Sequence, residues 1–416
     1  MLMLSGATAA QAPVPLTRAE VIAQARERNL ELRAARERLG LQEAELAQAR
    51  QLLPSNPEIE AEVGSDRPFN NEGERRLGIG LAQEFEIAGQ RGLRKAQASA
   101  QLREAQARWA ALEAQVARDA SGAFLRLWRA ERLRALARES LELNLTLEKA
   151  AESRFQAGDI SELERNVVAV DVARSRRELS SAETELVQAQ LDLARLLGRP
   201  DGMRLTVADL SLPTPTLAPL ENLQSLARER RADLAAARYS QEAAEARLHL
   251  HYRERIPNPT LRLGYERERF DPLDASPGGG GEVSSLLMGS ISIPLPLWNR
   301  QQGPIRAAQA EKAAATIERE ATERLVDTEV AAAFAAVERS REALEAVTAA
   351  LPKVERNLEL IRKSFEAGQV DLLELLNTRD RSQQARQEYV EARVEYVRAL
   401  DELMRATGQL PMEARQ

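Results

Sequence analysis

Few side chains in the sequence are of the types that carry out chemistry. The 416 residues include no cysteine, which excludes disulfides, thiol nucleophiles and thiolate metal sites. The only two histidines, His249 and His251, flank a single residue and therefore point to different faces of a helix, which disfavours a catalytic or zinc-binding pair. The run Gly278–Gly281 is followed by neither a lysine nor a helix start, which a phosphate-binding loop requires. We therefore predict no enzyme activity, no cofactor and no metal site.

The composition indicates long helices. Alanine, leucine, arginine and glutamate dominate, and aromatic residues make up only 4% of the chain, which is too few for a large globular core. The 58 basic and 64 acidic residues are interspersed and give a net charge of −6, so no basic surface for nucleic acid is expected. No apolar run reaches the roughly 18 residues that a transmembrane helix needs.

The N-terminal segment, residues 1–16, has the character of a processed leader. Met1–Ala12 ends in small residues, as the end of a signal peptide with its cleavage site does. Because a basic start and most of an apolar centre are missing, we interpret the segment as the remnant of an export signal with a misassigned start. The alternative is a plain disordered terminus.

The chain repeats itself. Arg154–Leu163 is similar to Ser364–Leu373, and the offset from Gly158 to Gly368 is 210 residues. Nearer the start the offset is 202, since Asn56-Pro57 corresponds to Asn258-Pro259. Repeats of this kind predict two copies of one structural unit. We place the first repeat at 17–210, a proline-rich linker at 211–219, the second repeat at 220–410 and a short tail at 411–416.

Each repeat reads as helix, two strands, very long helix and last helix. Apolar residues recur every seven positions in the last helices, as at Val172, Leu179, Leu186 and Leu193, which predicts coiled-coil packing. The last helices end at glycines, which commonly terminate helices. The predicted elements are first helices at 17–53 and 219–256, strands at about 57–66, 75–87, 259–268 and 285–295, long helices at about 90–156 and 301–366, and tips at 157–161 and 367–371.

The predicted strands have one apolar and one polar face. In the first of them Ile59, Ala61 and Val63 alternate with glutamates, and each strand has about the length that a tilted strand needs to cross a bilayer. Four strands cannot close on themselves, so a membrane role requires several chains to pool their strands. The alternative is a pair of soluble hairpins. Four aromatic residues near the strand ends fit a membrane-interface girdle or simple hairpin packing equally well: Phe69, Tyr265, Phe270 and Trp298.

Four stretches in this order resemble the TolC-like outer membrane factor family. Two are the tip motifs, Arg154-Phe155-x-Ala-Gly158 with Glu164, and Ser364-Phe365-x-Ala-Gly368 with Glu374. The other two, Gln83–Gly92 and Ile293–Gly303, are similar to the strand-to-helix junctions of the CzcC-like heavy-metal efflux branch. The resemblance covers residues 17–410.

The resemblance implies a mainly α fold with a small β part. Three chains would form a homotrimer, in which four strands per chain make a 12-stranded outer-membrane β-barrel in lipid, on a periplasmic α-helical coiled-coil tunnel. The implied partners are a periplasmic adaptor (membrane fusion protein) and an inner-membrane RND pump. The implied function is passive efflux, with divalent heavy-metal cations as cargo. The alternatives are drug efflux or type I secretion through the same conduit, and, from a different class, a periplasmic coiled-coil adaptor.

The resemblance also implies roles for residues at the tips. The acid six residues after each glycine, Glu164 or Glu374, would line a negatively charged ring at the periplasmic entrance and favour cations. Asn377 stands where the family often has a second acid, and Val370 stands where some branches have a gating arginine, which leaves Asp159, Asp371 and Arg379 as candidates for a closing ion pair. The alternative is that both glutamates are ordinary solvated positions. The candidate adaptor contacts are Phe155, Gly158, Asp159, Phe365, Gly368 and Asp371.

Overall fold

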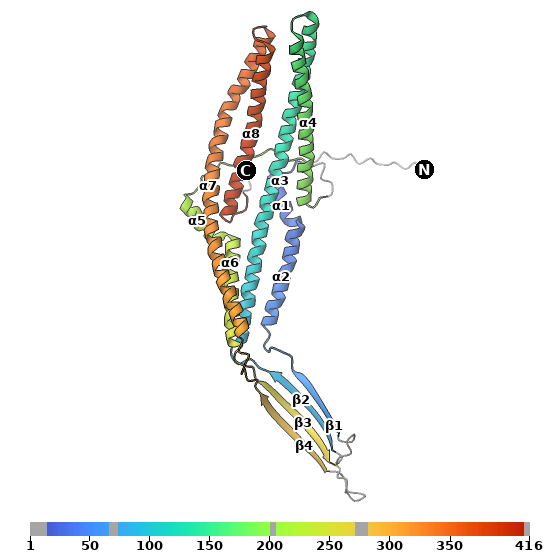
Figure 1. The fold of residues 1–416 in the computed structure, drawn as a ribbon, viewed down its shortest axis with the longest axis vertical. Helices are drawn as coiled ribbons and strands as arrows, with labels where there is room; N and C mark the ends of the chain where they lie inside the picture. The colour runs from blue at the N-terminus through green and yellow to red at the C-terminus, as the bar shows by residue number, and fades with distance from the viewer. Residues whose placement is uncertain (1–14, 66–73, 200–204, 271–281, 412–416) are drawn as a thin grey trace, which may run out of the picture. The chain divides into compact units, whose positions relative to one another are not determined.

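The structure is a computed structural model that describes residues 15–65, 74–199, 205–270 and 282–411. The expected leader at Met1–Ala12, Phe69, the Gly278–Gly281 run and the tail after residue 411 lie outside the described residues, as does the side chain of Phe270. Figure 1 shows the elements in chain order. These are α1 (Arg18–Arg28), α2 (Leu30–Ala49), β1 (Glu58–Ser65), β2 (Arg75–Glu84), α3 (Gln90–Ala157), α4 (Glu162–Leu196), α5 (Leu220–Arg230), α6 (Ala232–Arg253), β3 (Thr260–Phe270), β4 (Glu282–Ser292), α7 (Gln302–Glu366) and α8 (Leu372–Ala406).

The chain divides into two compact units, and each contains segments of both predicted repeats. The first comprises residues 1–36, 108–234 and 323–416, and the second comprises residues 37–107 and 235–322. The predicted fold class, mainly helical with four strands per chain, is confirmed. Among the helices of the described residues, none has a stretch that is long and apolar enough to cross a membrane.

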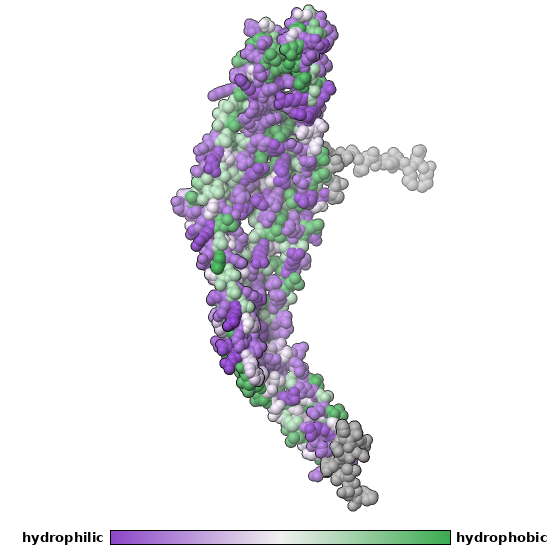
Figure 2. Space-filling view, viewed as in Figure 1, coloured by the Kyte–Doolittle hydropathy of each residue, from purple (hydrophilic) through white to green (hydrophobic). Residues whose placement is uncertain are grey.

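The first unit is held together by apolar seams between its helices. The larger cluster joins α1, α3, α4 and α8, and Phe124, Trp128 and Leu193 are almost fully buried in it. A second cluster joins α5, α6, α7 and α8 and includes Leu234, Val330 and Leu400. Most of these side chains are alanine, valine or leucine, because helices that pack along a narrow seam leave little room for larger ones. The surface in Figure 2 is largely hydrophilic, with apolar residues scattered over it.

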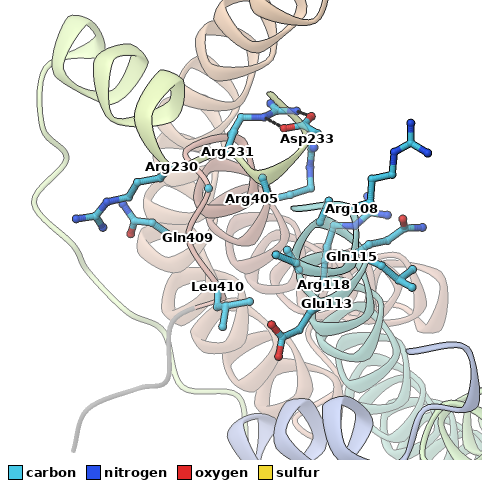
Figure 3. A pocket seen from close by; sticks show the side chains of 16 residues that line it. Arg108, Glu113, Gln115, Arg118, Arg230, Arg231, Asp233, Arg405, Gln409 and Leu410 are labelled. Atoms are coloured by element: carbon cyan, nitrogen blue, oxygen red, sulfur yellow. Dashed lines mark hydrogen bonds and ion pairs between the residues drawn. The ribbon is translucent and has the colours of Figure 1, made fainter. Parts of the chain in front are cut away.

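The first helix of each repeat is broken in two, which corrects the single helices expected at 17–53 and 219–256. The breaks fall at Asn29, with ψ of 123°, and at Arg231, with ψ of 121°. The Asn29 side chain accepts a hydrogen bond from the backbone N–H of Leu32 at 2.9 Å and so caps the start of α2. Arg231 is buried and donates to Asp233, as Figure 3 shows, and to Glu329. The two breaks are 202 residues apart, the offset found between the repeats near their starts.

The four strands form one antiparallel sheet in the order β1-β2-β3-β4, in the second unit. The two predicted hairpins are therefore joined, through pairs such as Ile79 with Tyr265. Three of the approximate strand bounds predicted from the sequence differ from the structure by three residues. β4 starts earlier and ends at Ser292, because Pro294 follows and cannot donate to a ladder. β2 ends at Glu84, beyond which Phe85 makes one last bond to the carbonyl oxygen of Pro259.

Candidate functional site

The two interhelical tips have the same backbone geometry. After α3, Gly158 has φ of +82°, its N–H donates to the carbonyl oxygen of Phe155 at 3.0 Å, and the next N–H donates to Arg154 at 2.9 Å. After α7, Gly368 has φ of +72° and the same two bonds form to Phe365 and Ser364 at 3.0 and 2.9 Å. This pair of bonds is the Schellman motif, in which a left-handed residue satisfies the last carbonyls of a helix. The motif explains why glycine occupies both positions.

The helices that leave the tips begin with side-chain caps. Ser161 and Glu164 form a reciprocal capping box at the start of α4, in which the Glu164 carboxylate accepts from the backbone N–H of Ser161 at 2.8 Å and from its hydroxyl at 2.7 Å. At the start of α8, Asp371 accepts from the backbone N–H of Glu374 at 2.7 Å. The pattern Ser161-x-x-Glu164 is a sequence signal for this cap, and our sequence analysis did not use it.

The two predicted ring carboxylates therefore differ. Hydrogen bonds from Ser161, the backbone N–H first and then the hydroxyl, hold the pKa of Glu164 below its usual range. Glu374 is exposed, and in the described part of the chain its carboxylate has no hydrogen-bonding partner. Asn377, one turn further along α8, is exposed as well. The Glu164 carboxylate is thus hydrogen-bonded to the start of its own helix, whereas the Glu374 carboxylate is exposed to solvent.

The phenylalanine ring at each tip is covered by an arginine side chain. Both are half-buried, Arg165 lies over the Phe155 ring at 4.4 Å, and Arg154 lies over the Phe365 ring at 4.7 Å. The second contact joins the first tip to the second. Between the tips, a small apolar cluster includes Ala151, Val168, Leu372 and Leu376, with Phe365 packed against it. The exposed surface of the tips comprises residues 156–159 and 366–369, including Gly158, Asp159 and Gly368; Asp371 is exposed beside it.

A buried arginine lies among α3, α4 and α8. The guanidinium group of Arg379 donates to the Asn144 side chain, to Asp171 at 3.2 Å and to the neighbouring Asp380 at 2.6 Å. Asn144 in turn donates to Ser175 at 2.6 Å. Of the three candidates for a closing ion pair, Arg379 thus makes one, but with Asp171, whereas Asp371 caps α8 and Asp159 is exposed. No sequence pattern indicates Asn144 or Asp171, because their roles depend on contacts between helices.

A polar cavity of about 420 Å³ adjoins Arg379. Asp171, Arg174, Glu178 and Asp380 line it together with three glutamines of α8, so acidic and basic groups are nearly balanced. The described residues contain no group of three or more His, Asp or Glu side chains with the arrangement of a metal site. The geometry of this region therefore suits the relative positioning of helices.

Several solved structures have the same fold. The outer membrane channel CmeC of Campylobacter jejuni matches with a TM-score of 0.77 and 15% identity, over 99% of this chain and 92% of that chain. A membrane protein from Pseudomonas aeruginosa matches with a TM-score of 0.76 and 21% identity, over 94% and 93%. The outer membrane protein VceC from Vibrio cholerae matches with a TM-score of 0.76 and 18% identity, over 95% and 97%.

The sequence itself matches a family model over most of its length. No individual protein with a curated description matches the chain. The model of the outer membrane efflux proteins matches residues 21–199 and 223–409, one segment in each predicted repeat. The predicted resemblance is thereby confirmed at the level of the family, while the CzcC-like branch stays a prediction. The chain belongs to the outer membrane efflux protein family.

Proposed function

We propose that the protein is the passive outer membrane channel of a tripartite efflux system, with a tunnel that extends into the periplasm. A homotrimer takes cargo from a periplasmic adaptor and an inner-membrane RND pump and releases it outside the cell. Besides the family to which the chain belongs, the observation that carries this proposal is the surface of its four-stranded sheet. One of its faces is apolar and exposed, and its two edge strands, β1 and β4, each lack a partner on one side among the described residues.

The exposed apolar face argues for a lipid environment. It carries large side chains with exposed fractions from 38% at Leu261 to 80% at Leu287, which is unusual for a sheet face in water. An open edge cannot lie in lipid, because its backbone groups would have no hydrogen-bonding partners. Three chains that pair β4 of one with β1 of the next would satisfy both edges and close a barrel of twelve strands. These residues form the face: Ile59, Val63, Leu77, Ile79, Leu81, Leu261, Leu263, Tyr265, Leu287 and Ile291.

The tips are the proposed periplasmic entrance and the proposed contact with the adaptor. Phe155 and Phe365 are half-buried, so they support the contact surface, which the exposed Gly158, Asp159, Gly368 and Asp371 would present. In a trimer, Glu374 contributes three exposed carboxylates around one aperture. A ring of this kind favours cations over anions.

Divalent heavy-metal cations are our proposed cargo. Support comes from the junction motifs at Gln83–Gly92 and Ile293–Gly303 and from the carboxylate at each tip. Selectivity among metals would then reside in the pump. Drugs or secreted proteins through the same conduit are the alternative. A periplasmic adaptor is disfavoured by the family to which the chain belongs.

Growth of a deletion strain tests the function and the cargo together. The panel contains zinc, cobalt, cadmium, nickel, copper and silver salts, and separately dyes, detergents and bile salts. We expect sensitivity to one group of metals, restored by the wild-type gene but not by a variant truncated after β2. Sensitivity to dyes and detergents alone would contradict the metal cargo and leave the conduit intact. Unchanged growth on the whole panel would contradict efflux.

A further inference from the structure

The charged residues of the sheet are sorted by sign between its two faces. Successive residues of a strand point to opposite faces, so the register assigns each side chain to one of them. Every glutamate of the four strands lies on the polar face, together with two arginines. Both of these arginines are paired there: Arg76 contacts Glu266 and Glu268 at 2.5 and 2.7 Å, and Arg262 contacts Glu60 at 2.6 Å.

The apolar face carries the remaining three arginines of the strands and no carboxylate in its described strand residues. They are Arg75 on β2 and Arg267 and Arg269 on β3. All three are exposed, and by the register all three lie at the end of the sheet where β2 begins and β3 ends. Apart from Ser65, Gln83 and Ser285, the rest of the face is apolar or glycine, so the charge is concentrated at one end of it.

Two of these arginines oppose each other directly. Arg75 and Arg269 are cross-strand partners, and Arg267 lies two residues from Arg269 on the same face. Directly opposed side chains have Cβ atoms about 5 Å apart, which is close enough for two guanidinium groups to contact one anion. Phosphate suits such a cluster because its oxygens accept the paired N–H groups of arginine.

The position of the cluster identifies the anion. A face that is apolar over most of its length and cationic at one end matches the border between the hydrocarbon of a membrane and its headgroups, where arginine is tolerated. A soluble anion would not require the adjoining apolar residues. We infer that Arg75, Arg267 and Arg269 form a binding site for the phosphate groups of an anionic lipid in the outer leaflet. This inference rests on the proposed function, because it requires the sheet to lie in the outer membrane.

Two adjacent residues provide a matched pair of variants. Arg75→Gln removes a charge from the apolar face, and Arg76→Gln removes the same charge at the same height from the polar face. The full-length protein is purified in detergent, and its affinity for lipid A that carries two phosphates is measured by native mass spectrometry. We expect binding about fivefold weaker for Arg75→Gln and on the order of a hundredfold weaker when all three arginines are replaced, but unchanged for Arg76→Gln. Lipid A without phosphates should bind wild-type protein as weakly as the triple variant binds lipid A.

The inference is overturned if Arg75→Gln binds lipid A as tightly as wild type does, or if Arg76→Gln loses as much affinity. Displacement of lipid A by millimolar inorganic phosphate would also overturn it, because the site would then recognise a soluble anion. Insertion of the wild-type protein into vesicles of phosphatidylethanolamine and phosphatidylglycerol is measured separately. Failure to insert would contradict the proposed function itself, whereas insertion with unaltered binding by the Arg75 variant would contradict the lipid site alone.

Discussion

At the scale of single residues, Asp401 shows how this helical protein holds a buried charge. Its carboxylate accepts from Arg18 at 2.8 Å and from the Ser121 hydroxyl, and so joins α8 to α1 and α3. Burial raises the pKa of Asp401, while Arg18 and Ser121 act in the opposite direction. The ionised form is therefore dependent on its partners.

Arg18→Met should destabilise the protein by about 3 kcal/mol at pH 7, because it leaves the buried carboxylate without its cation. A raised pKa in the folded state means that Asp401 costs the least stability below its ordinary value of 3.8 and more as the pH rises through the folded pKa. The loss should therefore shrink toward pH 4. Urea unfolding at both pH values measures it, with Arg33→Met on the exposed side of α2 as the control. An equal loss at both pH values would contradict this account.

The pH dependence of stability that we expect from Glu164 has the opposite sign, because its pKa is lowered and not raised. Its pKa lies below the ordinary 4.5 because Ser161 donates two hydrogen bonds to the ionised form. The cap of α4 is thus complete above pH 4.5 and is lost as the pH falls through the lowered folded pKa. Titration of labelled glutamate by NMR should give a higher pKa for Glu164 in Ser161→Ala, which loses the hydroxyl, but the pKa should stay below the ordinary 4.5 because the backbone N–H of residue 161 still donates. An unchanged pKa in this variant would show that the hydroxyl does not contribute.

At the scale of elements, the break in the first helix of each repeat lies against the glycine that follows the last helix of the same repeat. Gly408, with φ of +72°, follows α8 and lies against the break at Arg231, so closely that a Cβ atom would be 2.8 Å from the carbonyl carbon of Arg230. Gly198 faces the break at Asn29 in the same way, but a Cβ there would be 3.8 Å from the carbonyl oxygen of Arg28. The second repeat is the more tightly fitted of the two.

Alanine substitutions at Gly198, Gly368 and Gly408 should separate the cost of backbone strain from the cost of a steric clash. Gly368→Ala faces open space and should cost about 1 kcal/mol, the penalty of a left-handed conformation. Gly198→Ala should cost nearly the same. Gly408→Ala should cost a further 1–3 kcal/mol or so, because the backbone at the break must move. Thermal unfolding of the three variants measures the order, and equal losses would contradict the proposed role of the close contact.

At the scale of the whole molecule, each residue of the proposed trimer occurs three times around one axis, so a single charged position becomes a ring of three charges. Glu374 is exposed and Asn377 is one turn away, whereas the Glu164 carboxylate is held by its cap. In a conducting channel the three positions should therefore contribute unequally to the field at the entrance.

Reversal potentials across planar bilayers with a KCl gradient test this order. Glu374→Gln should reduce the preference for potassium over chloride, and Asn377→Asp should increase it. Glu164→Gln should have a smaller effect than Glu374→Gln because its charge is directed to the backbone of α4. An unchanged reversal potential in the first two variants would place the narrowest ring elsewhere.

The extent to which the sequence predicted the structure depends on the range of the forces involved. The tip glycines, the long helices and the alternating strands follow from local rules, and the structure contains them all within a few residues of the expected positions. The breaks at Asn29 and Arg231 and the Arg379 cluster were not predicted. The Asn29 break has a local signal, the side-chain cap to Leu32, whereas the Arg231 break and the Arg379 cluster depend on contacts with distant helices. The division into two repeats stays a prediction, which the matched offsets of the two breaks support.

The pairing of β2 with β3 has a consequence for the order of folding. Within each hairpin, strands meet across about a dozen residues or fewer, as Ser65 meets Arg75, but Arg75 meets Arg269 only after 194 further residues of chain. Closing so long a loop is slow. We expect pulse-labelled hydrogen exchange to show both hairpins protected before the β2–β3 pair. The β2–β3 pair at the centre of the sheet therefore forms only once the second half of the polypeptide is available. A ribosome or export machine that releases only the first half leaves the edge of β2 that pairs with β3 without a partner.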